Sequence, residues 1–202
     1  IINDDLNTLI TLSTAMGASA RRTYADVVHA AFLSNPNMGD GTALFHNDHG
    51  NIISIAALDV DGIGAAVQKM NAQKDMRGLR RLNIKPQFFV APTALYGTGE
   101  KFFATTVIGT QAEPNVINPY TGLFGPGKRA YEGRLDDDAQ NVFYLMAAKG
   151  RTVKAFFLNG VKEPFIDFTD NWNNDGRKGK VRIDVGAAAV DWRGMLKVTI
   201  TG

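Results

Sequence analysis

The chain has 202 residues, of which 45% are hydrophobic and 21% charged, enough to fill the core of one large domain or two small ones. Its 22 basic and 20 acidic residues leave a net charge of only +2, which excludes a strongly basic nucleic-acid wrapper. Without cysteine it can hold no disulfide, thiolate metal site or cysteine nucleophile. We also expect neither membrane insertion nor secretion, because the sequence has no apolar run of membrane-spanning length and no charged-then-apolar leader.

The N-terminal part predicts one long helix. Asp4 and Asp5 are good N-cap residues, apolar side chains recur at helical spacing over residues 6–32, and Asn35-Pro36 ends the pattern. A helix of about 29 residues would be roughly 44 Å long at 1.5 Å per residue. That length favours an elongated subunit over a compact domain.

The next segments predict a small α/β unit. Residues 35–52 are rich in Gly, Asn and Asp and predict a long loop. Residues 59–73 predict a helix, and residues 85–92, with Phe-Phe-Val at their centre, predict a buried strand. A second helix is expected over residues 93–103, with Thr93 as its cap.

The last third of the chain predicts strands. Residues 115–133 are rich in Gly and Pro and are expected to be irregular. Asn159-Gly160 lies between two apolar runs and predicts a hairpin, and residues 171–179 predict a second, longer turn. Strands are predicted at residues 142–146, 153–158, 165–168, 181–185 and 195–200.

Two Gly- and Asn-rich segments imitate ligand-binding loops. Residues 122–128 have the spacing of a phosphate-binding loop, but Arg129 stands where Ser or Thr would bind magnesium, and the strand–loop–helix context is missing. Residues 171–176 resemble the start of a calcium loop, but its twelfth position is Arg182 rather than Glu. We interpret both as ordinary loops.

The histidines offer one enzymatic alternative. His46, Asp48 and His49 could bind a metal ion in a metal-dependent hydrolase, but the neighbouring glycines favour a polar loop that hydrogen-bonds locally. No serine occurs in a Gly-x-Ser-x-Gly elbow, and we interpret residues 136–138 (Asp-Asp-Asp) as a solvated turn. We therefore predict no enzyme, no metal and no cofactor.

Five segments, which occur in the same order in one known family, resemble the Mu-like prophage major head subunit, a branch of the Hong Kong 97-type capsid fold. They are IINDDL (1–6), RRTYADVVHAAFLSNPNMGDGTALFHNDHGN (21–51), LNIKPQFFVAPTAL (82–95), VKAFFLNGVKEPFID (153–167) and KVRIDVGAAAVDWRGMLK (180–197). Each segment alone is modestly specific, whereas the ordered set is specific.

The resemblance implies an α+β fold: a Hong Kong 97-type capsid fold with a long spine helix, a peripheral β-sheet and an inserted α/β axial domain. On that mapping residues 1–58 plus 159–202 form the peripheral domain and residues 59–158 the axial domain. Family members also carry an N-terminal arm and an extended loop, which we expect to lie outside this sequence.

The implied function is that of a structural head subunit which assembles with copies of itself into pentamers and hexamers of an icosahedral shell. The shell would enclose DNA, touched only non-specifically, and the subunit would pass from the host bacterial cytoplasm to the virion capsid. No membrane and no small-molecule substrate are expected. Another virion structural protein is the second alternative. The candidate subunit-contact residues are Arg21, Arg22, Arg77, Arg80, Arg81, Tyr120, Phe124, Lys128 and Arg129.

Overall fold

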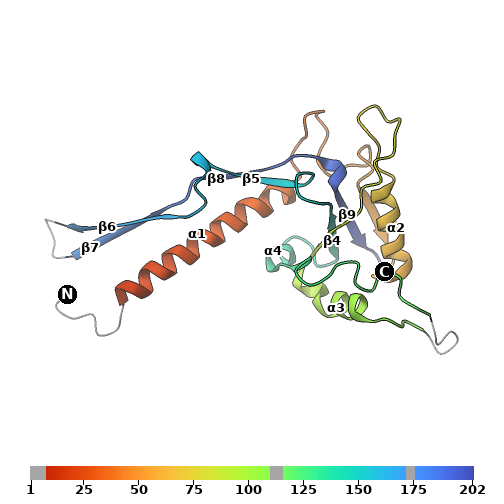
Figure 1. The fold of residues 1–202 in the computed structure, drawn as a ribbon, viewed down its shortest axis with the longest axis horizontal. Coiled ribbons are helices and arrows are strands. Elements are labelled where there is room, and N and C mark those ends of the chain that lie inside the picture. Colours follow the sequence, from red (N-terminus) through yellow and green to blue (C-terminus); the bar gives the residue numbers. More distant parts are fainter. Residues whose placement is uncertain (1–7, 110–115, 172–175) are drawn as a thin grey trace. The chain divides into compact units, whose positions relative to one another are not determined.

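The structure is a computed structural model that describes residues 8–109, 116–171 and 176–202 (Figure 1). The chain forms two compact units. The first unit comprises Ile1–Ser34 and Lys154–Ala188, and the second comprises Asn35–Val153 and Ala189–Gly202. Residues 35–153 of the second unit are therefore inserted in the sequence of the first unit. The chain returns to the second unit at residue 189.

The first unit contains the long helix that the sequence predicts. This helix, α1 (Thr8–Leu33), has 26 residues, and the expected caps Asp4 and Asp5 lie outside the described residues. The helix ends before Asn35, whose φ of 47° is the left-handed conformation that commonly follows a helix, and Pro36 cannot continue it. In the described part of the chain, no helix has both the length and the apolar character needed to cross a membrane.

The strands of the first unit form two-stranded pairs. β6 (Phe165–Asn171) and β7 (Gly176–Arg182) are antiparallel over seven residue pairs, from Phe165↔Arg182 to Asn171↔Gly176. β5 (Val153–Phe157) pairs with β8 (Val185–Ala189). The predicted strand over residues 181–185 is thus wrong at its centre, because β7 ends and β8 begins within it. The predicted turn at 171–179 includes residues 172–175, which lie outside the described residues.

The Asn159-Gly160 signal predicts the turn correctly but not the hairpin. Asn159 and Gly160 have φ values of 52° and 74°, and Val161 N–H donates to Leu158 O at 3.1 Å. The flanking strands nevertheless pair elsewhere, β5 with β8 and β6 with β7. Pro164 lies where a returning strand would begin, and it has no N–H to donate to a ladder.

The second unit is built on a mixed sheet with the strand order β1-β9-β4-β2-β3. The β1–β9 and β2–β3 pairs are parallel, and β4 is antiparallel to both β9 and β2. The central strands are apolar and mostly buried, the pattern of strands covered on both faces. The bounds are β1 (Ile52–Ile55), β2 (Phe88–Ala91), β3 (Arg129–Tyr131), β4 (Val142–Met146) and β9 (Met195–Ile200).

Two helices predicted from the sequence are present beside this sheet. α2 (Val60–Asn71) is capped by Asp59, whose carboxylate accepts a hydrogen bond from Gly62 N–H at 2.8 Å. The helix predicted at 93–103 consists of a 3₁₀ turn, η1 (Thr93–Leu95), followed by α3 (Tyr96–Ala104).

The predicted cap of that second helix is wrong. The cap is supplied by Asp136, at the end of the short helix α4 (Gly133–Asp136), which accepts hydrogen bonds from the Thr93 hydroxyl, Thr93 N–H and Ala94 N–H. These three bonds lower the pKa of the Asp136 carboxyl, with the Thr93 hydroxyl as the main cause. Asp136 therefore has a structural role that its position in an Asp-Asp-Asp run did not predict.

The units do not coincide with the expected domains. The expected division placed residues 35–58 and 189–202 with the long helix. In the structure these residues supply β1 and β9, which complete the sheet of the second unit. Which residues occupy peripheral or axial positions in a shell stays a prediction.

An aromatic cluster fills the core of the second unit, and Phe89 is at its centre. The Phe89 side chain is fully buried, and its ring centroid lies 5.0 Å from Phe143, 5.1 Å from Phe103 and 5.9 Å from both Phe124 and Tyr131. Edge-on and tilted contacts of this kind add to the free energy gained by burying the rings.

We predict that Phe89→Ala destabilises the second unit by about 3–5 kcal/mol, because the substitution leaves a cavity that its neighbours cannot fill. Urea unfolding followed by circular dichroism measures the change. The matched control is Phe156→Ala in the first unit, whose side chain is 49% exposed and should cost about 1 kcal/mol or less. Equal losses for the two variants would contradict the assignment of Phe89 to the core.

Candidate contact surface

The nine predicted contact residues lie on three parts of the chain. Arg21 and Arg22 are exposed on α1, and the other seven belong to the second unit. Three of these are exposed arginines after α2, and four lie between residues 120 and 129.

The residues from 120 to 129 mostly serve internal packing. Phe124 is fully buried and packs edge-on against Phe103 at 5.2 Å, so its prediction as a contact side chain is corrected. Arg129 donates two hydrogen bonds to Glu100, at 2.7 and 2.9 Å, and a third to the carbonyl of Phe124. Tyr120 is half-buried beside Gly64 of α2, and Lys128 alone of the four is exposed.

Residues 74–81, here called the arginine loop, carry Arg77, Arg80 and Arg81. Asp75 organises the loop: its carboxylate accepts hydrogen bonds from Leu79 N–H at 2.9 Å and Arg80 N–H at 3.3 Å. The bond from Leu79 is the main reason that the pKa of Asp75 lies below its ordinary value. Gly78 takes a φ of +69°, which favours glycine, and donates to Asp75 O at 3.0 Å. Hydrogen bonds within the loop therefore stabilise this conformation.

The outer surface of the arginine loop is both apolar and cationic. Met76 is 90% exposed and Leu79 is 78% exposed. The guanidinium groups of Arg77, Arg80 and Arg81 are exposed and form no ion pair with a described residue. Methionine and arginine are among the residue types enriched in protein–protein interfaces.

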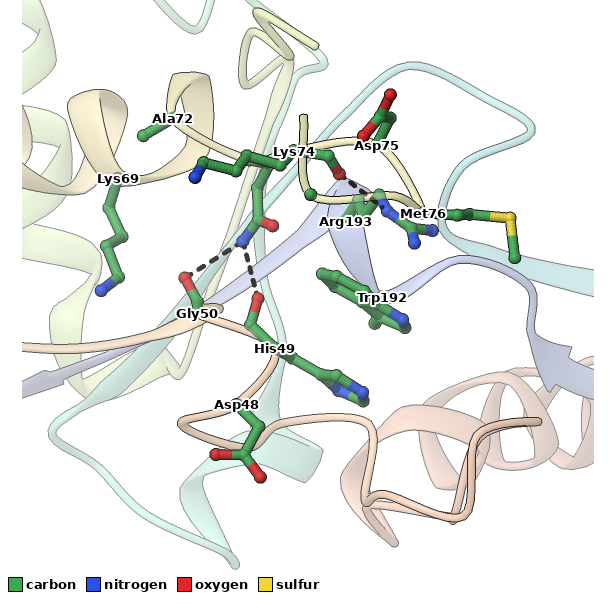
Figure 2. A pocket seen from close by; sticks show the side chains of 12 residues that line it. Asp48, His49, Gly50, Lys69, Ala72, Lys74, Asp75, Met76, Trp192 and Arg193 are labelled. Atoms are coloured by element: carbon green, nitrogen blue, oxygen red, sulfur yellow. Dashed lines mark hydrogen bonds between the residues drawn. The ribbon is translucent and has the colours of Figure 1, made fainter. Parts of the chain in front are cut away.

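Arg193 anchors the base of this loop (Figure 2). Its Nε donates to the carbonyl of Lys74 at 3.0 Å, and its Nη1 forms an ion pair with Asp191 at 3.1 Å. Its guanidinium also lies 4.1 Å from the ring centroid of Trp192, a cation–π contact. The segment before β9 thereby fixes where the arginine loop leaves the domain.

His49 extends the anchor into the loop at residues 35–51. Its imidazole stacks on Trp192 with centroids 4.4 Å apart and planes 4° apart. The buried ring bonds to the Leu44 carbonyl through Nδ1 at 3.0 Å and to the Asp40 carboxylate through Nε2 at 2.8 Å. The bond from His49, together with one from Thr42 N–H, lowers the pKa of Asp40. Asp40, His49, Trp192 and Arg193, here called the anchor stack, therefore join three segments far apart in the sequence.

An open hollow of about 390 Å³ lies beside the anchor stack. Its lining includes Lys69, Gln73 and Trp192, and Figure 2 shows the lining side chains. Gln73 donates from Nε2 to the carbonyls of His49 and Gly50, at 3.1 and 3.0 Å, which joins the segment just after α2 to the loop at residues 35–51. No motif in the sequence predicted this arrangement, because its residues come from three separate segments.

The structure gives no support to the metal-binding alternative. His46 contacts Asp48 at 3.4 Å, whereas both ring nitrogens of His49 bond to Leu44 and Asp40. Among the residues that the structure describes, no three His, Asp or Glu side chains are placed to bind one metal ion.

The comparisons with known proteins agree on the class of protein. The sequence matches the family model described as phage capsid protein over residues 1–198. No curated protein matches the sequence. Among solved structures, the fold is similar to a chain in the capsid of Myoviridae phage XM1, with a TM-score of 0.60 and 10% sequence identity. That likeness covers 96% of this chain and 66% of the phage XM1 chain, so this chain spans about two thirds of its length.

The mixed α+β architecture thus resembles a phage capsid fold. The family match gives the chain the structural role of a phage capsid protein rather than that of an enzyme. The chain belongs to the phage capsid protein family. The family match confirms the prediction of a phage capsid protein, whereas membership of the Mu-like branch stays a prediction.

We predict that Asp40→Asn lowers the stability of the second unit at pH 5 and above but not in strong acid. Because the folded-state pKa of Asp40 lies below its ordinary 3.8, its stabilising contribution is present above that value and is lost as the pH falls through the folded pKa. Urea unfolding of both proteins, from about pH 5 down to about pH 2, measures the difference.

The control for this experiment is Asp48→Asn in the same loop. Its side chain is 79% exposed, and its ion pair among the described residues is with the half-exposed His46, so its removal should change stability little at any of these pH values. A difference between wild type and Asp40→Asn that persists unchanged in strong acid would contradict the role given to the carboxylate.

Proposed function

We propose that this chain is the greater part of a major head subunit of the Hong Kong 97 type, from the Mu-like branch. In this proposal it associates with copies of itself into pentamers and hexamers of an icosahedral shell that encloses DNA. The observation that carries the proposal is the family match over residues 1–198. The ordered segments that resemble the Mu-like head subunit support the finer assignment.

The path of the chain supports an inserted-domain architecture. α1 is followed by the whole of β1 to β4 before the chain returns to the first unit at Lys154. In the proposal the axial domain, expected at residues 59–158, contains α2, α3 and strands β2 to β4. The peripheral domain, expected at 1–58 plus 159–202, contains α1 and the β6–β7 pair, and by these bounds it also includes β1 and β9 of the five-stranded sheet.

The surface of the first unit supports self-association. Leu158 is 63% exposed, Val161 59% and Phe165 51%, all within eight residues of one another. The strands described in this unit form two-stranded sheets, which are marginally stable alone in water. Exposed apolar side chains beside such small sheets are what contact with a neighbouring subunit would cover.

DNA would meet this protein only through non-specific charge contacts. The net charge of +2 is too small for the chain to bind DNA as a whole, so any contact would depend on local clusters such as Arg21 and Arg22. Binding of this kind weakens steeply as salt concentration rises.

We predict that the intact subunit forms rings of five or six copies, or closed shells. Negative-stain electron microscopy shows the symmetry, and light scattering over a range of protein concentration, salt and pH measures the mass. Head-to-tail contacts that close into rings are required for such particles.

Two outcomes would contradict the proposal. A strict monomer at high concentration, in every salt and pH condition, would remove self-assembly. Rings with a symmetry other than five or six would instead indicate another structural protein of the virion.

A further inference from the structure

We propose that the arginine loop of one copy docks onto the acidic turn at Asp137 and Asp138 of the next copy, as a head-to-tail contact within a ring. This inference rests on the proposed function and deepens it, since it names the two surfaces that meet.

The arginine loop has the properties of a preorganised docking element. Asp75 holds it through hydrogen bonds from Leu79 and Arg80 N–H, and Arg193 holds its base at Lys74 O. A loop already in its bound conformation loses little conformational entropy on binding. Its rigid surface can therefore be recognised as a shape.

The chemistry of the loop favours a protein partner over DNA. Met76 and Leu79, at 90% and 78% exposure, lie among the three arginines. DNA would use only the cations, because phosphate groups gain nothing from apolar side chains. A protein surface uses both, since burial of the apolar side chains removes them from water while the guanidinium groups pair with carboxylates.

A surface that pairs with the arginine loop must offer carboxylates that have no partner of their own in the described part of the second unit. Asp137, Asp138 and Asp61 form no ion pair or side-chain hydrogen bond there, and Asp137 and Asp138 are adjacent and exposed at the end of α4. The others are all engaged, namely Asp40, Asp48, Asp59, Asp75, Glu100, Glu132, Asp136 and Asp191. Two adjacent unpaired anions thus match the unpaired cations of the arginine loop.

The two surfaces cannot meet within one copy. In Figure 1 the arginine loop, yellow, lies beyond the end of α2 at the top of the second unit, while α4 lies lower and on the other side of the sheet strands β4 and β9. A contact between two different surfaces of identical copies is heterologous, and such contacts generate rings when the rotation closes. The same pair of surfaces would then repeat at every subunit boundary of the ring.

A charge swap tests the pairing. Arg77→Glu with Arg80→Glu, and separately Asp137→Arg with Asp138→Arg, should each reduce the assembled fraction about tenfold, because like charges then face each other. The variant with all four changes should recover to within about twofold of wild type. The readouts are light scattering and electron microscopy of the intact subunit, with circular dichroism to establish folding.

The matched control reverses charges elsewhere in the same unit. Arg151→Glu with Asp61→Arg changes one exposed arginine and one exposed carboxylate, neither of which forms an ion pair with a described residue, and it should assemble as wild type. Normal assembly of both the arginine-reversed and the aspartate-reversed variants would overturn the pairing. Loss of assembly in both, without recovery in the variant that carries all four changes, would also overturn it. Weaker binding of duplex DNA by the arginine-reversed variant, with normal assembly, would assign the loop to DNA instead.

A second measurement does not depend on charge reversal. The chain has no cysteine, so Arg80→Cys with Asp137→Cys introduces one reactive group on each surface. Oxidation of assembled particles should give a ladder of covalently linked subunits, whereas Arg151→Cys with Asp61→Cys should not. Particles that form normally and give no ladder would overturn this inference while leaving the proposed function intact, and a wild-type protein that never assembles would overturn the proposed function itself.

Discussion

Strand β9 is the element on which the second unit depends. It lies between β1 and β4 and pairs with both, so residues near the end of the chain join the segment at 52–55 to the segment at 142–146. Its side chains at Leu196 and Val198 are fully buried in the core, with β4 beside them. Without β9, β1 would have no strand to pair with and β4 would expose one edge. The segment just before β9 also carries Trp192 and Arg193, so the same strand that closes the sheet positions the anchor stack.

The anchor stack explains how a surface loop can be both exposed and rigid. Surface loops are commonly more mobile than the elements they connect, so a loop of fixed conformation needs contacts that hold its base. Here the contacts run from the Asp40 carboxylate through the imidazole of His49 and the indole of Trp192 to the guanidinium of Arg193. Stacked planar groups with fixed hydrogen bonds allow little movement, which makes the arginine loop an extension of the folded domain.

Local patterns predicted the elements that are long or strongly apolar. The 26-residue α1 and strands β2, β4 and β9 follow from helical spacing or apolar runs. The short strands β1 and β3 were missed, because four residues after an Asn-rich loop and three within a Gly-rich one carry no periodic signal.

Local patterns also could not predict contacts between segments that are distant in the sequence. The hairpin expected at Asn159-Gly160 was wrong because β5 pairs with β8, and the cap expected from Thr93 was wrong because Asp136 arrives from α4. For the contact surface, charge alone singled out Arg77, Arg80 and Arg81, which are exposed in the structure, and their role as subunit contacts stays a prediction. The stacking of His49 on Trp192, more than a hundred residues later, has no local signature.

The interleaved path of the chain sets an order of events on the ribosome. α1 is made first, but the strand that packs on it, β7 (Gly176–Arg182), is made more than a hundred residues later. At about 5–20 residues per second, this interval is on the order of ten seconds. For that time the apolar stripe of α1 is without its partner from the same chain, while the sheet of the second unit also waits for β9. The first unit can therefore be completed only after β7 and β8 have been made, and the second only after β9 has been made, so that folding of this region is delayed until its translation has finished.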